Sequence, residues 1–260
     1  MPRSLWTAAS GMSAQQTNVD VIANNIANVS TNGFKRQVAL FQDLFYDIAV
    51  APGGKAGDLG RNPTGTQIGT GVRLSSTPRV FTPGQIEPTG VQTDMAIEGD
   101  GLFQVQLPDG TTAYTRAGDF RVDADGSLVT PEGYYLEPRI TIPDQASQIS
   151  ISTTGVVTAT VNNAETTVGT VTLARFRNNA GLLAQGSNLF RETAASGAPI
   201  TGNAGASGYG NIRQSSLEKA NVEIVTELVD LITAQRAYEL NSKSIKTSDQ
   251  MLSTANDLVR

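Results

Sequence analysis

The chain has 260 residues and a net charge of −5, with 39% hydrophobic and 17% charged residues. It contains neither Cys nor His, which excludes disulfides, thiolate nucleophiles and any catalytic triad or metal site built on imidazole. The acidic balance argues against a protein that binds the nucleic-acid backbone. The N-terminus is too polar for the apolar core of a signal peptide, and no run approaches the roughly 18 apolar residues of a membrane span. We therefore expect no membrane span, and either a cytosolic protein or one exported with its N-terminus intact.

Residues 4–28 have the pattern of a long amphipathic helix. One row of apolar side chains with a seven-residue period consists of Leu5, Met12, Val19 and Ile26. A neighbouring row, interrupted by Gln15, consists of Ala8, Ile22 and Val29. The pair Asn32-Gly33 supplies the turn chemistry that follows a helix. The pattern predicts a helix of coiled-coil type.

Asparagines occupy this helix where a soluble helix would carry Glu and Lys. They are Asn18, Asn24, Asn25 and Asn28. Amides can bond to neighbouring helices in crowded packing without bringing an unpaired charge. We interpret this composition as that of a helix surrounded by other helices.

Residues 41–71 include "APGGKAGDLGRNPTGTQIGTG", which is rich in Gly, Pro and Thr. This composition predicts a linker or a long extended loop.

Residues 72–212 change to a two-residue period. Short alternating runs, such as Phe103, Val105 and Leu107, are separated by turn signals at residues 100–101, 108–110 and 125–126. The pattern predicts an all-β domain, either a small barrel or a sandwich.

The helical period returns near the C-terminus. One unbroken seven-residue row consists of Leu217, Ile224, Leu231, Tyr238, Ile245, Leu252 and Val259. Its first half is widened by Val225, Leu228, Val229 and Ile232. We predict a second coiled-coil-type helix from about residue 217. Two half-polar helices that packed only on each other would bury little apolar surface, so both ends are expected to need further partners.

Motifs that could carry chemistry are weak. The Asp123–Asp125–Gly126 run lacks the Glu at position 12 of a calcium loop, where Tyr134 stands, so a turn is the better interpretation. The "GDG" at residues 99–101 has no helix after it and is read as a tight turn. Scattered carboxylates leave a carboxylate-only hydrolase or a cell-wall carbohydrate-binding module as a less favoured alternative. We predict no catalytic, cofactor-binding or metal-binding residues and no cofactor.

Three segments resemble the bacterial flagellar rod and hook axial proteins. They are "ANNIANVSTNGFKR" (23–36), "MAIEGDGLFQVQLPDGTTAYTRAGDFRVDADGSLVTPEGYYL" (95–136) and "ANVEIVTELVDLITAQRAYELNSKSIKTSDQML" (220–252). The segments lie in the order of that family and cover about a third of the chain. The resemblance implies a structural axial protein, not an enzyme, that polymerises helically into the distal rod and transmits torque from the motor to the hook. A proximal rod protein or a short hook protein of the same family remains an alternative.

The resemblance also implies an organisation. The fold would be α+β, with residues 1–40 and 213–260 pairing as an inner helical core, 41–71 as an extended segment and 72–212 as the β domain. The extended segment, above all residues 46–69, would bridge neighbouring subunits and stiffen the rod. The implied partners are copies of the chain, proximal rod and hook proteins along the axis, the periplasmic and outer-membrane ring proteins, the rod cap and the type III export apparatus, with no nucleic acid. Export without a cleaved signal peptide would place the protein in the basal body, in a rod that crosses the periplasm.

Residues of both helices are expected to form the packing surfaces between subunits, with the three asparagines as polar packing residues and Gly33 as the turn out of the core. The predicted residues are Leu5, Met12, Val19, Ile22, Asn24, Asn25, Ile26, Asn28, Gly33, Ile224, Leu228, Leu231, Tyr238, Ile245, Leu252 and Val259.

Overall fold

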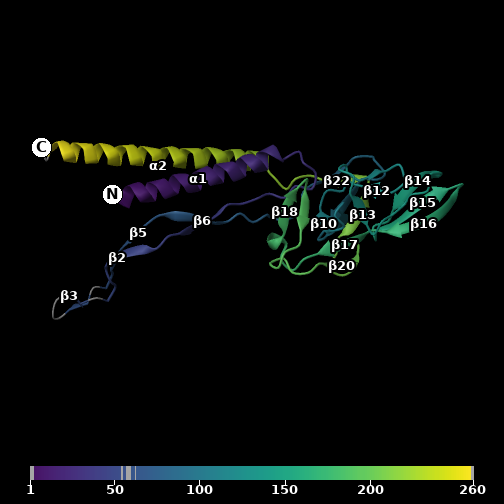
Figure 1. Cartoon of the computed structure of the whole chain (residues 1–260), viewed down its shortest axis with the longest axis horizontal. Helices are drawn as coiled ribbons and strands as arrows, with labels where there is room; N and C mark the ends of the chain where they lie inside the picture. The colour runs from purple at the N-terminus through teal and green to yellow at the C-terminus, as the bar shows by residue number, and fades with distance from the viewer. Residues whose placement is uncertain (1–2, 54, 57–59, 62, 259–260) are drawn as a thin grey trace. The chain divides into compact units, whose positions relative to one another are not determined.

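The computed structural model describes residues 3–53, 55–56, 60–61 and 63–258. Two compact units divide the chain (Figure 1). Unit 1 consists of Met1–Ile26, Gln37–Pro78 and Ile224–Arg260, and unit 2 of Ala27–Arg36 and Arg79–Glu223. The N- and C-terminal segments therefore share a unit, while most of the chain between them forms the other.

Unit 1 contains both long helices, α1 (Arg3–Ala27) and α2 (Ile224–Leu258). Proline, which would break a helical hydrogen bond, is absent from both helices. Gly11 is the single glycine among their residues, so few residues of low helix propensity interrupt them. The helices lie side by side and run in opposite directions (Figure 1). Neither helix of the described chain has the length and apolar character that a membrane crossing requires.

The rest of unit 1 is a ribbon of three antiparallel strand pairs. β1 (Leu40–Asp43) pairs with β6 (Val72–Ser76), β2 (Tyr46–Val50) with β5 (Thr66–Gly69), and β3 (Lys55–Ala56) with β4 (Gly60–Arg61). Composition predicted a linker or loop here, but the described residues form strands. The reason is local: Tyr46, Ile48 and Val50 supply aromatic and β-branched residues on one strand, and Thr66 and Ile68 supply them on the other. Each pair is two-stranded, so both edges of the ribbon are without a third strand in the described structure.

Unit 2 is built from antiparallel strands, as the two-residue period predicted. Its strands are β7 (Ile86–Pro88), β8 (Met95–Glu98), β9 (Leu102–Gln106), β10 (Thr112–Thr115), β11 (Arg121–Val122), β12 (Leu128–Val129), β13 (Tyr135–Glu137), β14 (Ala146–Ile151), β15 (Val156–Val161), β16 (Ala164–Thr170), β17 (Thr172–Arg175), β18 (Leu183–Gly186), β19 (Leu189–Arg191), β20 (Ile200–Asn203), β21 (Asn211–Gln214) and β22 (Ser216–Glu218). The largest sheet has the order β11-β12-β13-β9-β10-β19-β18, and β17 joins β20 to it through β9. β14-β15-β16 form a separate sheet, while β8 pairs with β21 and β7 with β22. A short 3-10 helix spans Asn179–Gly181.

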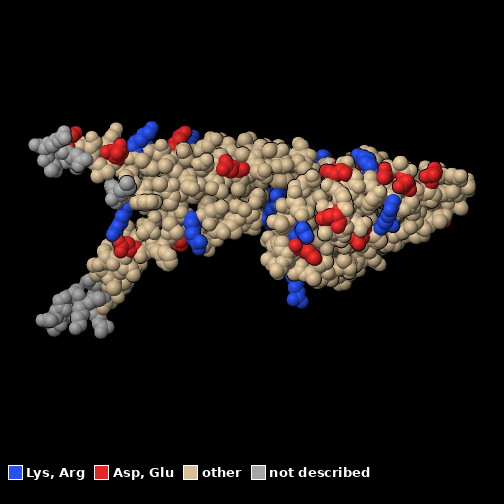
Figure 2. Space-filling model, viewed as in Figure 1, with Lys and Arg blue, Asp and Glu red and all other residues tan. Residues whose placement is uncertain are grey.

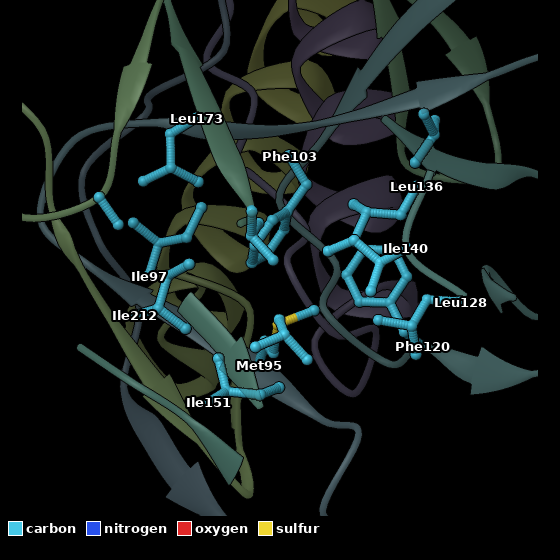
Figure 3. Packing of buried hydrophobic residues seen from close by; sticks show 14 of the residues in the cluster. Met95, Ile97, Phe103, Phe120, Leu128, Leu136, Ile140, Ile151, Leu173 and Ile212 are labelled. Atoms are coloured by element: carbon cyan, nitrogen blue, oxygen red, sulfur yellow. The ribbon is translucent and has the colours of Figure 1, made fainter. Parts of the chain in front are cut away.

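The core of unit 2 collects the inward side chains of these strands (Figure 3). Phe103 and Phe120 meet edge to face at its centre, with ring centroids 5.3 Å apart, the geometry that aromatic pairs prefer. The predicted turns are present. Gly110 and Gly126 both have positive φ and donate to the backbone oxygens of Leu107 and Asp123, each at 2.9 Å. The Asp123–Gly126 run is therefore a turn.

The α+β class and the all-β centre predicted from the sequence are thus confirmed, but the start of the second helix was predicted seven residues too early. Leu217 belongs to β22, where it pairs with Glu87, and α2 begins at Ile224. A buried strand residue that happens to fall seven positions before a helical row cannot be separated from that row by periodicity alone.

Candidate functional site

The two helices of unit 1 face each other through a fixed antiparallel register. Near one end, Asn25 bonds to Glu227. A second contact joins Gly11, fourteen residues before Asn25 on α1, to Asn241, fourteen residues after Glu227 on α2. A Cβ added to Gly11 would lie 3.0 Å from the side-chain nitrogen of Asn241. Counting seven residues from each contact places Asn18 of α1 opposite Ala234 of α2.

This contact line, which we call the polar seam, is made of small and polar residues. It consists of Gly11, Asn18, Asn25, Glu227, Ala234 and Asn241. Asn25 and Glu227 are each only 1% exposed. Sequence reasoning followed the large apolar rows and missed this one, although its seven-residue spacing on both helices was a readable signal.

Asn25 makes three side-chain hydrogen bonds at one end of the polar seam. Its side-chain oxygen accepts a hydrogen bond from the backbone nitrogen of Gln37 at 2.9 Å, and its amide nitrogen donates to the Gln37 carbonyl oxygen at 2.8 Å. The same nitrogen donates to Oε2 of Glu227 at 3.2 Å. One amide therefore joins α1, the returning chain and α2, which accounts for an asparagine at this helical position.

A group of large apolar side chains at the start of α2 points away from the polar seam. Five of them form what we call the apolar face, with exposed fractions of 44–69%: Ile224, Val225, Leu228, Val229 and Ile232. At 100° per residue, the centre of this face lies roughly 150° around the helix from the seam positions 227, 234 and 241. α1 therefore cannot cover it. Figure 2 shows broad uncharged areas between widely spaced charged side chains on the face of unit 1 turned to the viewer.

The predicted packing residues fall into three groups by exposure. The buried ones are Ile22, Asn25 and Gly33; the half-buried ones are Leu5, Met12, Val19, Ile26, Asn28, Leu231 and Ile245; the exposed ones are Asn24, Ile224, Leu228, Tyr238 and Leu252. Val259 lies outside the described residues. Val19 and Tyr238 come together with Gln16, Gln235 and Glu239 around a groove of about 380 Å³ between the helices.

Gly33 and Asn28 serve the turn that follows α1. The backbone oxygen of Asn28 accepts from the nitrogen of Thr31 at 3.0 Å. Gly33 has φ +70°, and a Cβ there would lie 2.5 Å from the backbone nitrogen of Ala117. Only glycine fits this position without moving the backbone.

Unit 2 contains a polar hollow of about 430 Å³. Its lining residues are Asn28, Ser30, Thr31, Asn32, Thr115, Ala117, Asp119, Thr130, Pro131, Glu132, Ser187, Asn188 and Leu189. Burial raises the pKa of Asp119, and the nearby charges of Glu132 and Asp94 act in the same direction. The lining offers hydroxyls and amides but no aromatic platform on which a sugar ring could stack. Across the residues that the structure describes, no cluster of three or more carboxylates is arranged to hold a metal ion.

A helix pair that closes through a polar seam and leaves five large apolar side chains of α2 exposed is typical of one class of protein, the subunits of helical assemblies. Comparison with known proteins agrees with this class. The pattern "Flagella basal body rod protein" matches residues 5–35, "Flagellar hook protein FlgE/F/G D1 domain" matches 96–159, and "Flagellar basal body rod FlgEFG protein C-terminal" matches 213–258.

Full-length relatives carry the name "Flagellar basal-body rod protein FlgG". The chain is 49% identical to the one from Borreliella burgdorferi and 39% identical to the one from Bacillus subtilis, covering 100% of both chains in each case. It is 49% identical to that of Agrobacterium fabrum over 96% of this chain and 97% of the relative. A "Flagellar hook protein FlgE" from Helicobacter mustelae is 46% identical over 53% of this chain and 30% of its own length. The chain therefore belongs to the flagellar basal-body rod protein family, and it is a structural protein of the rod.

Proposed function

We propose that this chain polymerises helically into the distal rod, the shaft that transmits torque from the motor to the hook. Full-length similarity to FlgG proteins supports the rod over the hook, because the match to a hook protein spans only 30% of that relative. The observation that carries the proposal is the apolar face of α2, which the partner helix cannot reach.

The energetics favour coverage of this face by other copies. Burying a Val, Leu or Ile side chain fully is worth about 1.5–3 kcal/mol, and five such side chains stand 44–69% exposed on consecutive turns. The polar seam contributes specificity rather than a large apolar area. A single chain thus leaves much of its stabilising surface unused, and stacking many copies buries it.

Within this proposal, α1 and α2 form a coiled-coil-like inner core, unit 2 is the β domain, and the ribbon between Leu40 and Ser76 bridges neighbouring subunits. The predicted packing residues divide by role: the buried and half-buried ones hold the pair, and the exposed ones contact other copies. Proximal rod and hook proteins are the axial neighbours, and ring proteins, cap and export apparatus the remaining partners. The rod crosses the periplasm, and its function is mechanical rather than catalytic.

The test is a pair of matched variants on α2. Leu228→Asp places a charge on the apolar face, whereas Thr226→Asp adds the same charge at an exposed position about 130° around the helix from the centre of that face. Both positions are exposed in the single chain, so we expect either change to alter its stability by less than about 0.5 kcal/mol.

Concentrated full-length protein is examined by sedimentation and electron microscopy. Wild type and Thr226→Asp are expected to form elongated polymers, and Leu228→Asp to remain a folded single chain. Polymers of unchanged length in Leu228→Asp would refute the role of the apolar face.

A further inference from the structure

Three charged side chains are buried together inside unit 2. Lys35, Arg116 and Glu218 are each at most 4% exposed. They come from the "GFKR" stretch after α1, the end of β10 and the last strand before α2. We call them the clasp.

Glu218 lies at the centre of the clasp. Its Oε1 accepts from Nζ of Lys35 at 2.7 Å and from the backbone nitrogen of Gly84 at 2.8 Å. Its Oε2 accepts from Nε of Arg116. Both oxygens therefore accept charge-assisted bonds, the stronger class of hydrogen bond.

Arg116 organises the "GDG" turn. Its Nη2 donates to the carbonyl oxygens of Ile97 at 2.6 Å and Gly99 at 2.7 Å, and its Nη1 donates to that of Gly101. Gly99 and Gly101 both have positive φ. Three carbonyls converge on one guanidinium, which explains the motif without a phosphate or a metal.

The clasp contains two cations and one anion, so Glu218 is shared. Burial lowers the pKa of Lys35, and the attraction of Glu218 opposes that shift. Burial works against the charge of Glu218 as well, yet Arg116 and Lys35 together lower the pKa of this carboxyl. Removing one partner from such a group leaves a buried charge uncompensated, whereas removing a matched pair does not.

Three separate passages of the chain meet at the clasp. The nitrogen of Gly33 donates to the oxygen of Glu218 at 2.7 Å, and Nζ of Lys35 donates to the oxygen of Thr82 at 2.8 Å. The nitrogen of Val80 donates to the oxygen of Arg36 at 2.8 Å. Asn221 completes the junction, since its side chain accepts from the nitrogen of Arg36 at 2.6 Å and donates to the oxygen of Val80 at 2.8 Å.

These passages, residues 33–36, 79–82 and 218–221, lie close to three of the four points at which the chain passes from one unit to the other: residue 36, residue 79 and residue 223. The main apolar cluster of unit 2 is formed by other residues, although Phe81 packs against a smaller second cluster. We propose that Glu218 is a positioning residue, and that the clasp holds the three passages in the fixed register within unit 2 that assembly requires, while the main β core folds without it. The assembly part rests on the proposed function; the register part does not.

Hydrogen exchange of the full-length, unpolymerised chain tests the register part. Glu218→Gln leaves two buried cations without their anion, and we expect amide exchange in all three passages to accelerate at least tenfold while the amides of Phe103 and Leu136 stay protected. Adding Lys35→Met removes one orphaned cation, so the double variant should exchange at least threefold more slowly in these passages than Glu218→Gln alone.

Glu87→Gln is the matched control. It removes a carboxylate from the adjacent strand β7, where Glu87 lies 3.8 Å from Lys219 in an exposed pair, and should leave exchange unchanged.

If Glu218→Gln unfolds, Lys35→Met alone remains informative. In this variant the charges of Arg116 and Glu218 still balance each other. It should accelerate exchange in residues 33–36 and 79–82 but not in the "GDG" turn. Any of three results would overturn the proposal. They are an exchange rate in the passages within twofold of wild type, a loss of core protection in every variant, and faster exchange in the double variant than in both single variants.

Polymerisation, followed by sedimentation, is the second readout. If wild type polymerises, Glu218→Gln should polymerise at least tenfold less at equal concentration, and Glu87→Gln normally; wild-type-like polymers of Glu218→Gln would overturn the positioning role. If wild type itself fails to polymerise, the proposed function fails and the exchange data alone decide whether the clasp holds the passages.

Discussion

Asn25→Asp is the sharpest test of the polar seam, because it changes one buried amide into a carboxylate of the same shape. The carboxylate can still accept from the nitrogen of Gln37, but it loses the donated bonds to the Gln37 oxygen and to Glu227. Each lost bond is worth about 0.5–1.5 kcal/mol, and an oxygen left buried without a donor costs about 1–3 kcal/mol. A like charge against the buried Glu227 adds to this. We expect helix-pair stability to fall by about 3–5 kcal/mol.

Urea unfolding of the unpolymerised chain, followed by circular dichroism at a helical wavelength, measures this change. Glu227→Gln in the Asn25→Asp background should recover roughly 1–2 kcal/mol, because the new amide can donate to the new carboxylate and the like-charge repulsion disappears. Asn24→Asp is the control: it makes the same chemical change one residue away at an exposed position and should cost less than about 1 kcal/mol. Equal losses for Asn24→Asp and Asn25→Asp would show that helix charge, rather than the seam, sets the effect.

Two further predictions concern the ribbon and the β core. Deleting residues 50–66, which include positions outside those described, removes the β3–β4 pair and the Val50–Thr66 end of the β2–β5 ladder and should give polymers that bend under electron microscopy; equally straight polymers would exclude a stiffening role for this segment. Burial, helped by the charges of Glu192 and Glu137, raises the pKa of Tyr114 to about 12, so between pH 10 and 12 the unfolded chain loses this proton first and stability falls by roughly 2–3 kcal/mol. Tyr114→Phe should lack this fall in urea melts across the same pH range, and parallel wild-type and variant curves would contradict the shift.

Local rules predicted the elements well. The seven-residue rows gave both helices, and the alternation around Phe103 gave the β domain with its turns at Gly110 and Gly126. These signals are short-range, because they depend on the helical repeat, the strand pleat and the φ of glycine. Periodicity failed where two rules gave the same pattern, as at Leu217, and composition failed in the ribbon, where alternating residues outweighed Gly and Pro.

The residues that hold distant segments together could not be predicted. Lys35 and Glu218 are 183 positions apart, and Asn25 and Glu227 are 202 apart. A single Lys or Glu in a strand-rich sequence is predicted to be exposed on the surface, because charged residues are almost never fully buried without a partner. That partner can be identified only from the folded structure. The neighbour that covers each apolar row could not be predicted either. The sequence period shows that a helix has an apolar stripe, but it does not show which element packs against that stripe.

Under the proposed function, the polar seam and the apolar face have different roles. The seam would fix the register of the helix pair in a single chain, and the apolar face would stabilise the pair only after assembly. A seam of amides, one glycine and a buried carboxylate fixes register at small apolar cost, because any slip along the helices separates Asn25 from Glu227 and drives Gly11 off Asn241. Had the large apolar row lain in the seam, the pair would have been stable by itself and would have offered neighbours a polar surface. The apolar face lies roughly 150° away from the seam. Under the proposed function, its hydrophobic gain would be available for contacts with other copies, so each helix pair would form in one register before assembly supplied most of its stability.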